Sequence, residues 1–116
     1  MVSFNVKQRK SEDVTVLDLK GRIVLGEETT RLEGDLKALV ASGQKKILLN
    51  LAEVTYIDSG GLGALVRSQT AAMAQAGRIK LLCVTDKVNT LLRITKLQGP
   101  FERFDDEAKA IESFGQ

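Results

Sequence analysis

Apolar and polar residues alternate along the N-terminal part of the chain with the period of a β-strand. Val2, Phe4 and Val6 are separated by polar residues, which predicts a half-buried strand. Residues 14–19 (VTVLDL) predict a second strand. The polar segment 7–13 is expected to connect the two as antiparallel neighbours.

Two further runs, residues 46–51 and 79–84, leave almost no polar face, as expected for central strands covered on both sides. Segments with helical periodicity surround them. Their expected core positions are Leu32, Leu36, Leu39 and Val40 in residues 27–42; Leu62, Leu65, Val66, Met73 and Ala76 in residues 59–76; Val88, Leu91 and Leu92 in residues 85–97; and Ala108, Ile111 and Phe114 in residues 105–114. Gln69 interrupts the second stripe, and Gly77 is expected to end that helix.

The order of elements is therefore ββαβαβαα, with a further short strand suggested near residues 101–104. Strands that alternate with helices predict an α/β domain with right-handed parallel crossovers. We expect residues 1–116 to form one domain, with a mixed, mostly parallel β-sheet of four to five strands packed with about four α-helices.

The amino-acid composition excludes several classes of function. The 116 residues carry 17 basic and 15 acidic side chains, a net charge of +2, and the basic residues are scattered, so direct nucleic-acid binding is not expected. Histidine is absent, which excludes a Ser-His-Asp triad and a His-ligated zinc site. The lone Cys83 is expected to be a small buried apolar residue. No apolar run approaches about 18 residues, so we expect a cytoplasmic protein without membrane insertion.

The segment "YIDSGGLGAL", residues 56–65, contains the most distinctive chemistry. Asp58 and Ser59 stand where a central strand should turn into a helix, at the sheet edge where α/β proteins usually hold their sites. Ser59 is expected to be the helix N-cap. Gly60, Gly61 and Gly63 leave the helix start bare, so that a partner or a negative charge can approach closely.

Four interpretations of this segment compete. A capped helix with glycines for tight packing is the plainest. Nucleophilic catalysis by Ser59 lacks a histidine or nearby lysine as base, and a nucleotide site lacks the Lys-Ser/Thr that ends a P-loop. The fourth is a phosphorylated serine on a docking surface. The acidic pairs 27–28 and 105–106 fall in first helical turns, where capping explains them better than catalysis, and no metal or cofactor site is indicated.

The run "LLNLAEVTYIDSGGLGALV" resembles the signature of the STAS domain family, in particular the anti-sigma factor antagonists, whose pattern is a strand, a short turn and then Asp-Ser-Ser/Thr-Gly-Leu-Gly. The segments "LDLKGRIVLGEET" and "GRIKLLCVTDKVNTLLRITKLQGPFERFDDEAKAI" extend the resemblance over nearly the whole chain.

The resemblance implies a binding protein rather than an enzyme. Its unphosphorylated form would bind an anti-sigma factor with serine kinase activity and so release a sigma factor. Phosphorylation of Ser59 would end this binding, and a phosphatase would restore it. The implied partner-binding residues are Asp58, Ser59, Gly60, Gly61, Leu62 and Gly63, and Arg67 follows two turns after Ser59.

Two positions depart from the family pattern. Gly60 stands where the family has a second hydroxyl residue, and Val24 stands where many members have an aspartate. These departures leave an alternative open, in which the chain is a STAS scaffold or accessory module, of a stress-signalling assembly or a transporter, without a kinase switch.

Overall fold

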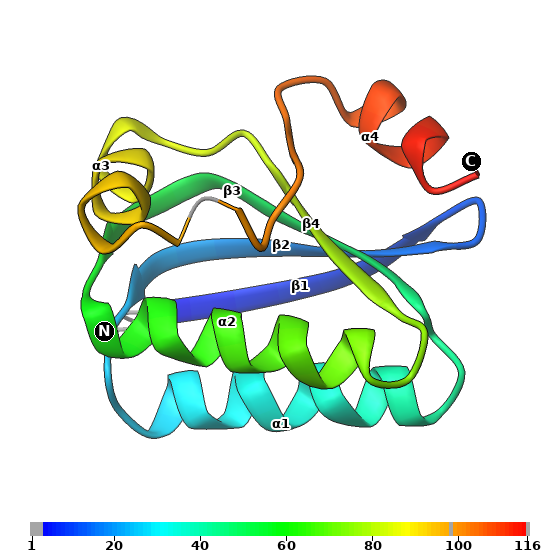
Figure 1. Cartoon of the computed structure of the whole chain (residues 1–116), viewed down its shortest axis with the longest axis horizontal. Helices are drawn as coiled ribbons and strands as arrows, with labels where there is room; N and C mark the ends of the chain where they lie inside the picture. Colours follow the sequence, from blue (N-terminus) through cyan, green and yellow to red (C-terminus); the bar gives the residue numbers. More distant parts are fainter. Residues whose placement is uncertain (1–3, 98, 116) are drawn as a thin grey trace.

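The computed structural model describes residues 4–97 and 99–115, which form one five-stranded sheet and four helices (Figure 1). In chain order the elements are β1 (Phe4–Ser11), β2 (Val14–Ile23), α1 (Glu27–Ala41), β3 (Lys46–Ile57), α2 (Ser59–Met73), β4 (Arg78–Leu82), α3 (Asp86–Thr95), β5 (Arg103–Phe104) and α4 (Glu107–Ser113). The strands lie in the order β1-β2-β3-β4-β5. Only β1 is antiparallel to its neighbour, so the predicted mixed, mostly parallel sheet is confirmed.

The larger apolar core lies between the sheet and the helices α1 and α2, which run side by side below it in Figure 1. Along β3, Ile47, Leu49 and Leu51 point into this core, while Leu48 points to the opposite face. All four side chains are fully buried, which confirms β3 as a central strand covered on both faces. The same core receives Val88 and Leu92 of α3.

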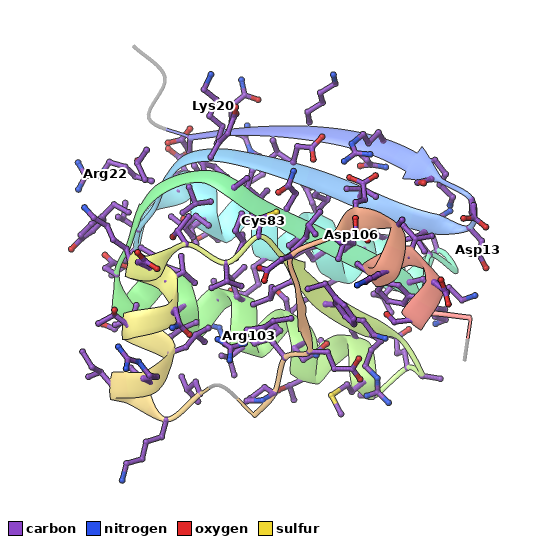
Figure 2. All side chains as sticks on the ribbon, turned by 90° about the horizontal axis from the view of Figure 1, so that it is seen from above. Asp13, Lys20, Arg22, Cys83, Arg103 and Asp106 are labelled. Carbon is purple, nitrogen blue, oxygen red and sulfur yellow. The ribbon has the colours of Figure 1, made fainter. Side chains whose placement is uncertain are left out.

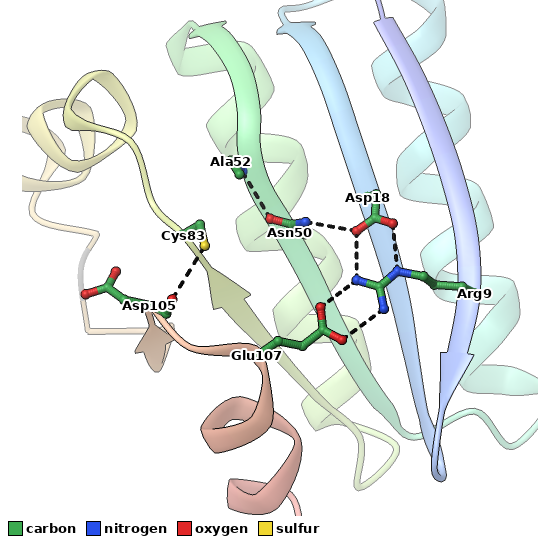
Figure 3. A network of polar contacts seen from close by, with 7 residues as sticks. All are labelled: Arg9, Asp18, Asn50, Ala52, Cys83, Asp105 and Glu107. Atoms are coloured by element: carbon green, nitrogen blue, oxygen red, sulfur yellow. Dashed lines mark hydrogen bonds and ion pairs between the residues drawn. The ribbon is translucent and has the colours of Figure 1, made fainter.

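The opposite face carries a smaller cluster, in which α4 covers part of the sheet. Its buried members are Val14, Val16, Leu48, Leu82, Ala110 and Ile111. Next to it, the guanidinium of Arg9 binds the carboxylate of Asp18 at 2.7 Å and that of Glu107 at 2.6 Å (Figure 3). Hydrogen bonds to Arg9 lower the pKa of both carboxyl groups and raise that of the guanidinium. This ion triad ties α4 to β1 and β2.

The prediction for the first strand was partly wrong. The expected connection 7–13 is mostly strand, because β1 continues to Ser11 and pairs with β2 along its whole length. Polar residues fit there because β1 is an edge strand and most of its side chains face solvent. Of the three apolar positions, Phe4 is buried, Val6 is 39% exposed, and Val2 lies outside the described residues.

The predicted faces of two helices also need correction. Leu62, Leu65 and Ala72 of α2 are buried, but Met73 is half exposed and Ala76 lies beyond the helix end. Ala76, and not Gly77, takes the left-handed conformation of the turn that follows α2. In α4 the buried residues are Ala110 and Ile111, while Ala108 faces solvent.

Gln69 lies on the buried side of α2 rather than interrupting it. Its side-chain oxygen accepts from the amide of Ile79 at 2.8 Å, and its nitrogen donates to the carbonyls of Ile79 and Pro100. A buried amide that is fully hydrogen-bonded is well tolerated. Gln69 therefore extends the hydrogen bonding of β4 from the helix side.

Cys83 is half-buried and comes after the end of β4, in a left-handed conformation. Its thiol lies 3.7 Å from the carbonyl oxygen of Asp105 (Figure 3). The strand is thus shorter than the predicted run 79–84, and the expectation of a buried cysteine holds only in part.

Candidate functional site

The turn between β3 and α2 is organised by Asp58, which is the N-cap of the helix. One carboxylate oxygen accepts from the amide of Gly61 at 2.7 Å. The two oxygens also accept from the amide of Leu25, at 3.2 and 3.3 Å. Asp58 therefore holds the helix start and the loop after β2 together.

Ser59 is the first residue of α2, and the expectation that it would be the N-cap was wrong. The aspartate before it has the extended backbone of a capping residue, with φ −109° and ψ 177°, so its carboxylate reaches the free amides first. Ser59 is exposed, and its hydroxyl makes no hydrogen bond to any residue in the described part of the chain. This hydroxyl is therefore free to react or to contact a partner.

Two of the glycines are required by the loop that follows β2. A Cβ on Gly61 would lie 2.0 Å from the carbonyl oxygen of Ile23, and one on Gly60 would lie 2.7 Å from the Cβ of Leu25. The hydroxyl residue that the family pattern has at the position of Gly60 would collide with Leu25 unless this loop moved. The bare helix start is thus a consequence of close packing as well as an open surface.

Arg67, which was expected at the docking surface, is paired with a carboxylate of the protein itself. Its guanidinium binds the carboxylate of Glu33 in α1, with distances of 3.0 and 3.1 Å. Arg67 and then Lys37 lower the pKa of Glu33 from its usual 4.5 to about 2. Arg67 nevertheless remains 59% exposed and passes over Gly63, so it lies beside the helix start while paired.

Exposed apolar side chains gather near the turn, and sequence reasoning missed them. Leu25 is 76% exposed directly after β2, and Tyr56, which precedes Asp58 by two residues, is 41% exposed. Arg22 lies over the Tyr56 ring, 5.1 Å from the ring centroid, and Lys87 lies 6.0 Å from it. Leu25 could have been singled out from the sequence, because it is an apolar residue in a short loop at the carboxyl end of a parallel strand.

Leu62 and the acidic residues singled out from the sequence lie where they were expected. Leu62 is buried under the helix start, and Glu27 and Glu28 lie in the first turn of α1 as expected. Asp106 caps α4, where an acidic residue was expected for that reason. Val24 follows the last residue of β2 and is half-buried. Among the described residues no group of histidine, cysteine or acidic side chains could hold a metal ion.

Comparisons with known proteins show which family the chain resembles. The family model of the STAS domain matches residues 5–110. The anti-sigma-B factor antagonist of Staphylococcus aureus is 34% identical over 67 residues, which are 58% of this chain and 62% of that protein, so less than two thirds of the curated relative is covered.

Solved structures share the fold. The crystal structure of a Thermotoga maritima protein, described as a candidate anti-sigma factor antagonist, has a TM-score of 0.86 at 23% identity and covers 96% of this chain and 95% of that one. The phosphorylated form of the Bacillus cell fate determinant SpoIIAA has a TM-score of 0.75 at 20% identity and covers 95% and 99%. In the described part of the chain, each helix is too short or too polar to span a membrane.

Proposed function

The chain belongs to the STAS domain family, and we propose that it is an anti-sigma factor antagonist controlled by phosphorylation of Ser59. Its unphosphorylated form binds an anti-sigma factor that is also a serine kinase, and this binding releases the sigma factor. One observation carries the proposal. The Ser59 hydroxyl is exposed and unbonded within the described residues, at a helix start that the glycines keep bare.

The site favours a switch by repulsion at the interface rather than by unfolding. A phosphate adds roughly −1.5 to −2 charges. The N-terminus of α2 stabilises such a charge by roughly 0.3–1 kcal/mol, so the free protein should tolerate it. Asp58 is the adjacent carboxylate, and Arg67 is engaged with Glu33. Docking would therefore remove water from a dianion beside the Asp58 carboxylate, with Arg67 already paired, and an unpaired buried charge costs several kcal/mol.

The rest of the proposal follows from the same role. The protein works by binding, without catalysis of its own and without a cofactor, in the cytoplasm. A separate phosphatase removes the phosphate from Ser59 and restores binding. The partner contacts Asp58 to Gly63 at the helix start, with Arg67 at the margin.

The test uses the cognate anti-sigma factor kinase and ATP. We expect mass spectrometry to find one added phosphate, on Ser59, and calorimetry to show binding weakened by orders of magnitude, since about 1.4 kcal/mol corresponds to tenfold in affinity. Ser59→Ala is the matched control, because it should bind the kinase as the wild type does and stay bound when ATP is added. A phosphate on another residue, or a phospho-Ser59 protein that binds as tightly as before, would contradict the proposal.

The alternative is a STAS scaffold or accessory module without a kinase switch, and Val24 is the observation in its favour. It predicts a stable large assembly in solution and no phosphate on Ser59 after treatment with the kinase. Size-exclusion chromatography with light scattering, run before and after that treatment, separates the two functions.

A further inference from the structure

A groove lies between the end of β3 and helix α3, next to the turn that carries Ser59. Its volume is about 380 Å³. Tyr56 and Ile57 form one wall, and Leu91, Ile94 and Lys87 of α3 belong to the other. Because Ile57 is bonded directly to Asp58, the groove is continuous with the surface around Ser59. We call it the Tyr56–α3 groove.

The groove walls contain apolar side chains that the fold leaves uncovered. Helix α3 buries Val88 and Leu92 in the core, but Ile94 is 72% exposed and Leu91 is only half-buried. Tyr56 adds its ring from the opposite wall, with 41% of its surface exposed. Uncovered apolar side chains that gather around one groove are typical of a protein-binding surface.

Two cations flank the aromatic wall. Arg22 and Lys87 lie over the ring of Tyr56, and neither forms an ion pair with a carboxylate in the described part of the chain. Asp86 is the one carboxylate in the groove lining, and it lies in the first turn of α3, where the helix dipole stabilises it. Figure 2 shows Arg22 projecting from the end of the molecule where α3 lies. The groove thus combines apolar side chains in both walls with a positively charged margin at Tyr56.

We propose that the Tyr56–α3 groove receives an apolar segment of the anti-sigma factor that is flanked by acidic residues. The inference rests on the proposed function and extends the docking surface from Ser59 across Tyr56 to α3. Apolar contacts with Ile94 and Tyr56 supply affinity, and Arg22 and Lys87 face the partner's carboxylates. Contacts in the groove supply affinity for the partner, and phosphorylation of Ser59 weakens that binding.

The experiment measures the affinity of unphosphorylated variants for the purified anti-sigma factor kinase that phosphorylates Ser59. Ile94→Ala should weaken binding by about tenfold or more, as is common for an apolar anchor at the centre of an interface. Lys87→Glu should weaken it to a similar degree, because the reversed charge at the margin would repel the partner's carboxylates. The matched controls are Met73→Ala, which truncates another half-exposed apolar residue outside the groove, and Lys109→Glu, which reverses an exposed charge on α4. Both controls should stay within about twofold of the wild type, since they lie outside the interface.

All four substituted side chains are exposed, so thermal unfolding should confirm that every variant is folded. If the wild type binds the kinase and is phosphorylated on Ser59, but Ile94→Ala and Lys87→Glu bind like the controls, the groove proposal is overturned and the proposed function stands. If Ile94→Ala weakens binding and Lys87→Glu does not, the acidic character of the segment is refuted. A wild-type protein that binds no anti-sigma factor overturns both proposals.

Discussion

The starts of α2 and α3 are built on the same plan and differ in what they leave free. Each helix follows a parallel strand at the carboxyl edge of the sheet. At α3 the Thr85 hydroxyl is itself the cap and accepts from the amide of Val88 at 3.4 Å. At α2 the Asp58 carboxylate caps, and the hydroxyl of Ser59 stays outside the helix's own hydrogen bonding.

The third position after each cap differs as well. It is Val88 in α3, a fully buried side chain, and Gly61 in α2, where the carbonyl of Ile23 leaves no room for a side chain. The loop after β2 is therefore what distinguishes the two turns. A hydroxyl becomes available for modification where a neighbouring carboxylate has taken over the cap, and the helix start stays bare where another loop presses against it.

The substitution with the largest expected effect disrupts the packing of Gly61 against the loop after β2. Gly61→Ala should lower the free energy of unfolding by at least about 2 kcal/mol, because the added Cβ meets backbone that must shift. Gly34→Ala is the matched control, since Gly34 has open space around it in the middle of α1, and it should gain up to about 1 kcal/mol. Urea unfolding measures both. Equal stability of the two variants would show that the loop after β2 yields easily.

A second substitution separates the two caps. Asp58→Ala removes the bond to Gly61 and those to Leu25, so it should cost about 2 kcal/mol, at the upper end for a cap. Thr85→Ala removes one long hydrogen bond and should cost about 0.5–1 kcal/mol. Asp58→Asn keeps a hydrogen-bond acceptor, so its loss of stability should lie between the losses of these two variants. If Asp58→Ala and Thr85→Ala are equally stable in urea, the bonds to the loop contribute nothing.

The ion pair between α1 and α2 gives a smaller, pH-dependent difference. Because Arg67 and Lys37 lower the pKa of Glu33 to about 2, its contribution is complete above its usual value of 4.5 and is lost as the pH falls toward 2. With Arg67 largely exposed, we expect about 1 kcal/mol or less. The measurement is the stability difference between wild type and Glu33→Gln from pH 7 to pH 2. A difference that does not shrink on acidification would contradict this assignment.

The smallest effect is expected at Ser59. Ser59→Ala should change the free energy of unfolding by less than about 0.5 kcal/mol, because its hydroxyl makes no hydrogen bond to the described residues. A serine that capped the helix would instead cost roughly 0.5–2 kcal/mol on replacement. Thermal unfolding of Ser59→Ala and Thr85→Ala, measured together, decides between these values. If Ser59→Ala is as unstable as Thr85→Ala, the serine is a cap after all.

Local pattern was enough to predict the order of elements. The mostly apolar run 46–51 marked the centre of the sheet, and the helical spacing of Leu32, Leu36 and Val40 marked the buried side of α1. These predictions succeeded because burial of a periodic apolar face dominates the placement of a helix or strand. The junction between strand and helix at Asp58 and Ser59 was also located correctly, because β3 ends at Ile57 and α2 begins at Ser59.

Contacts between distant segments decided what the pattern could not. The polar residues 7–11 form a strand because β2 pairs with them, and Gln69 is buried because the backbone of Ile79 and Pro100 satisfies its amide. The aspartate caps α2 in place of the serine, with the same carboxylate also binding the amide of Leu25, 33 residues away in sequence. Local periodicity reports only how each residue partitions between core and water, whereas these outcomes depend on which backbone groups the fold brings within hydrogen-bond distance.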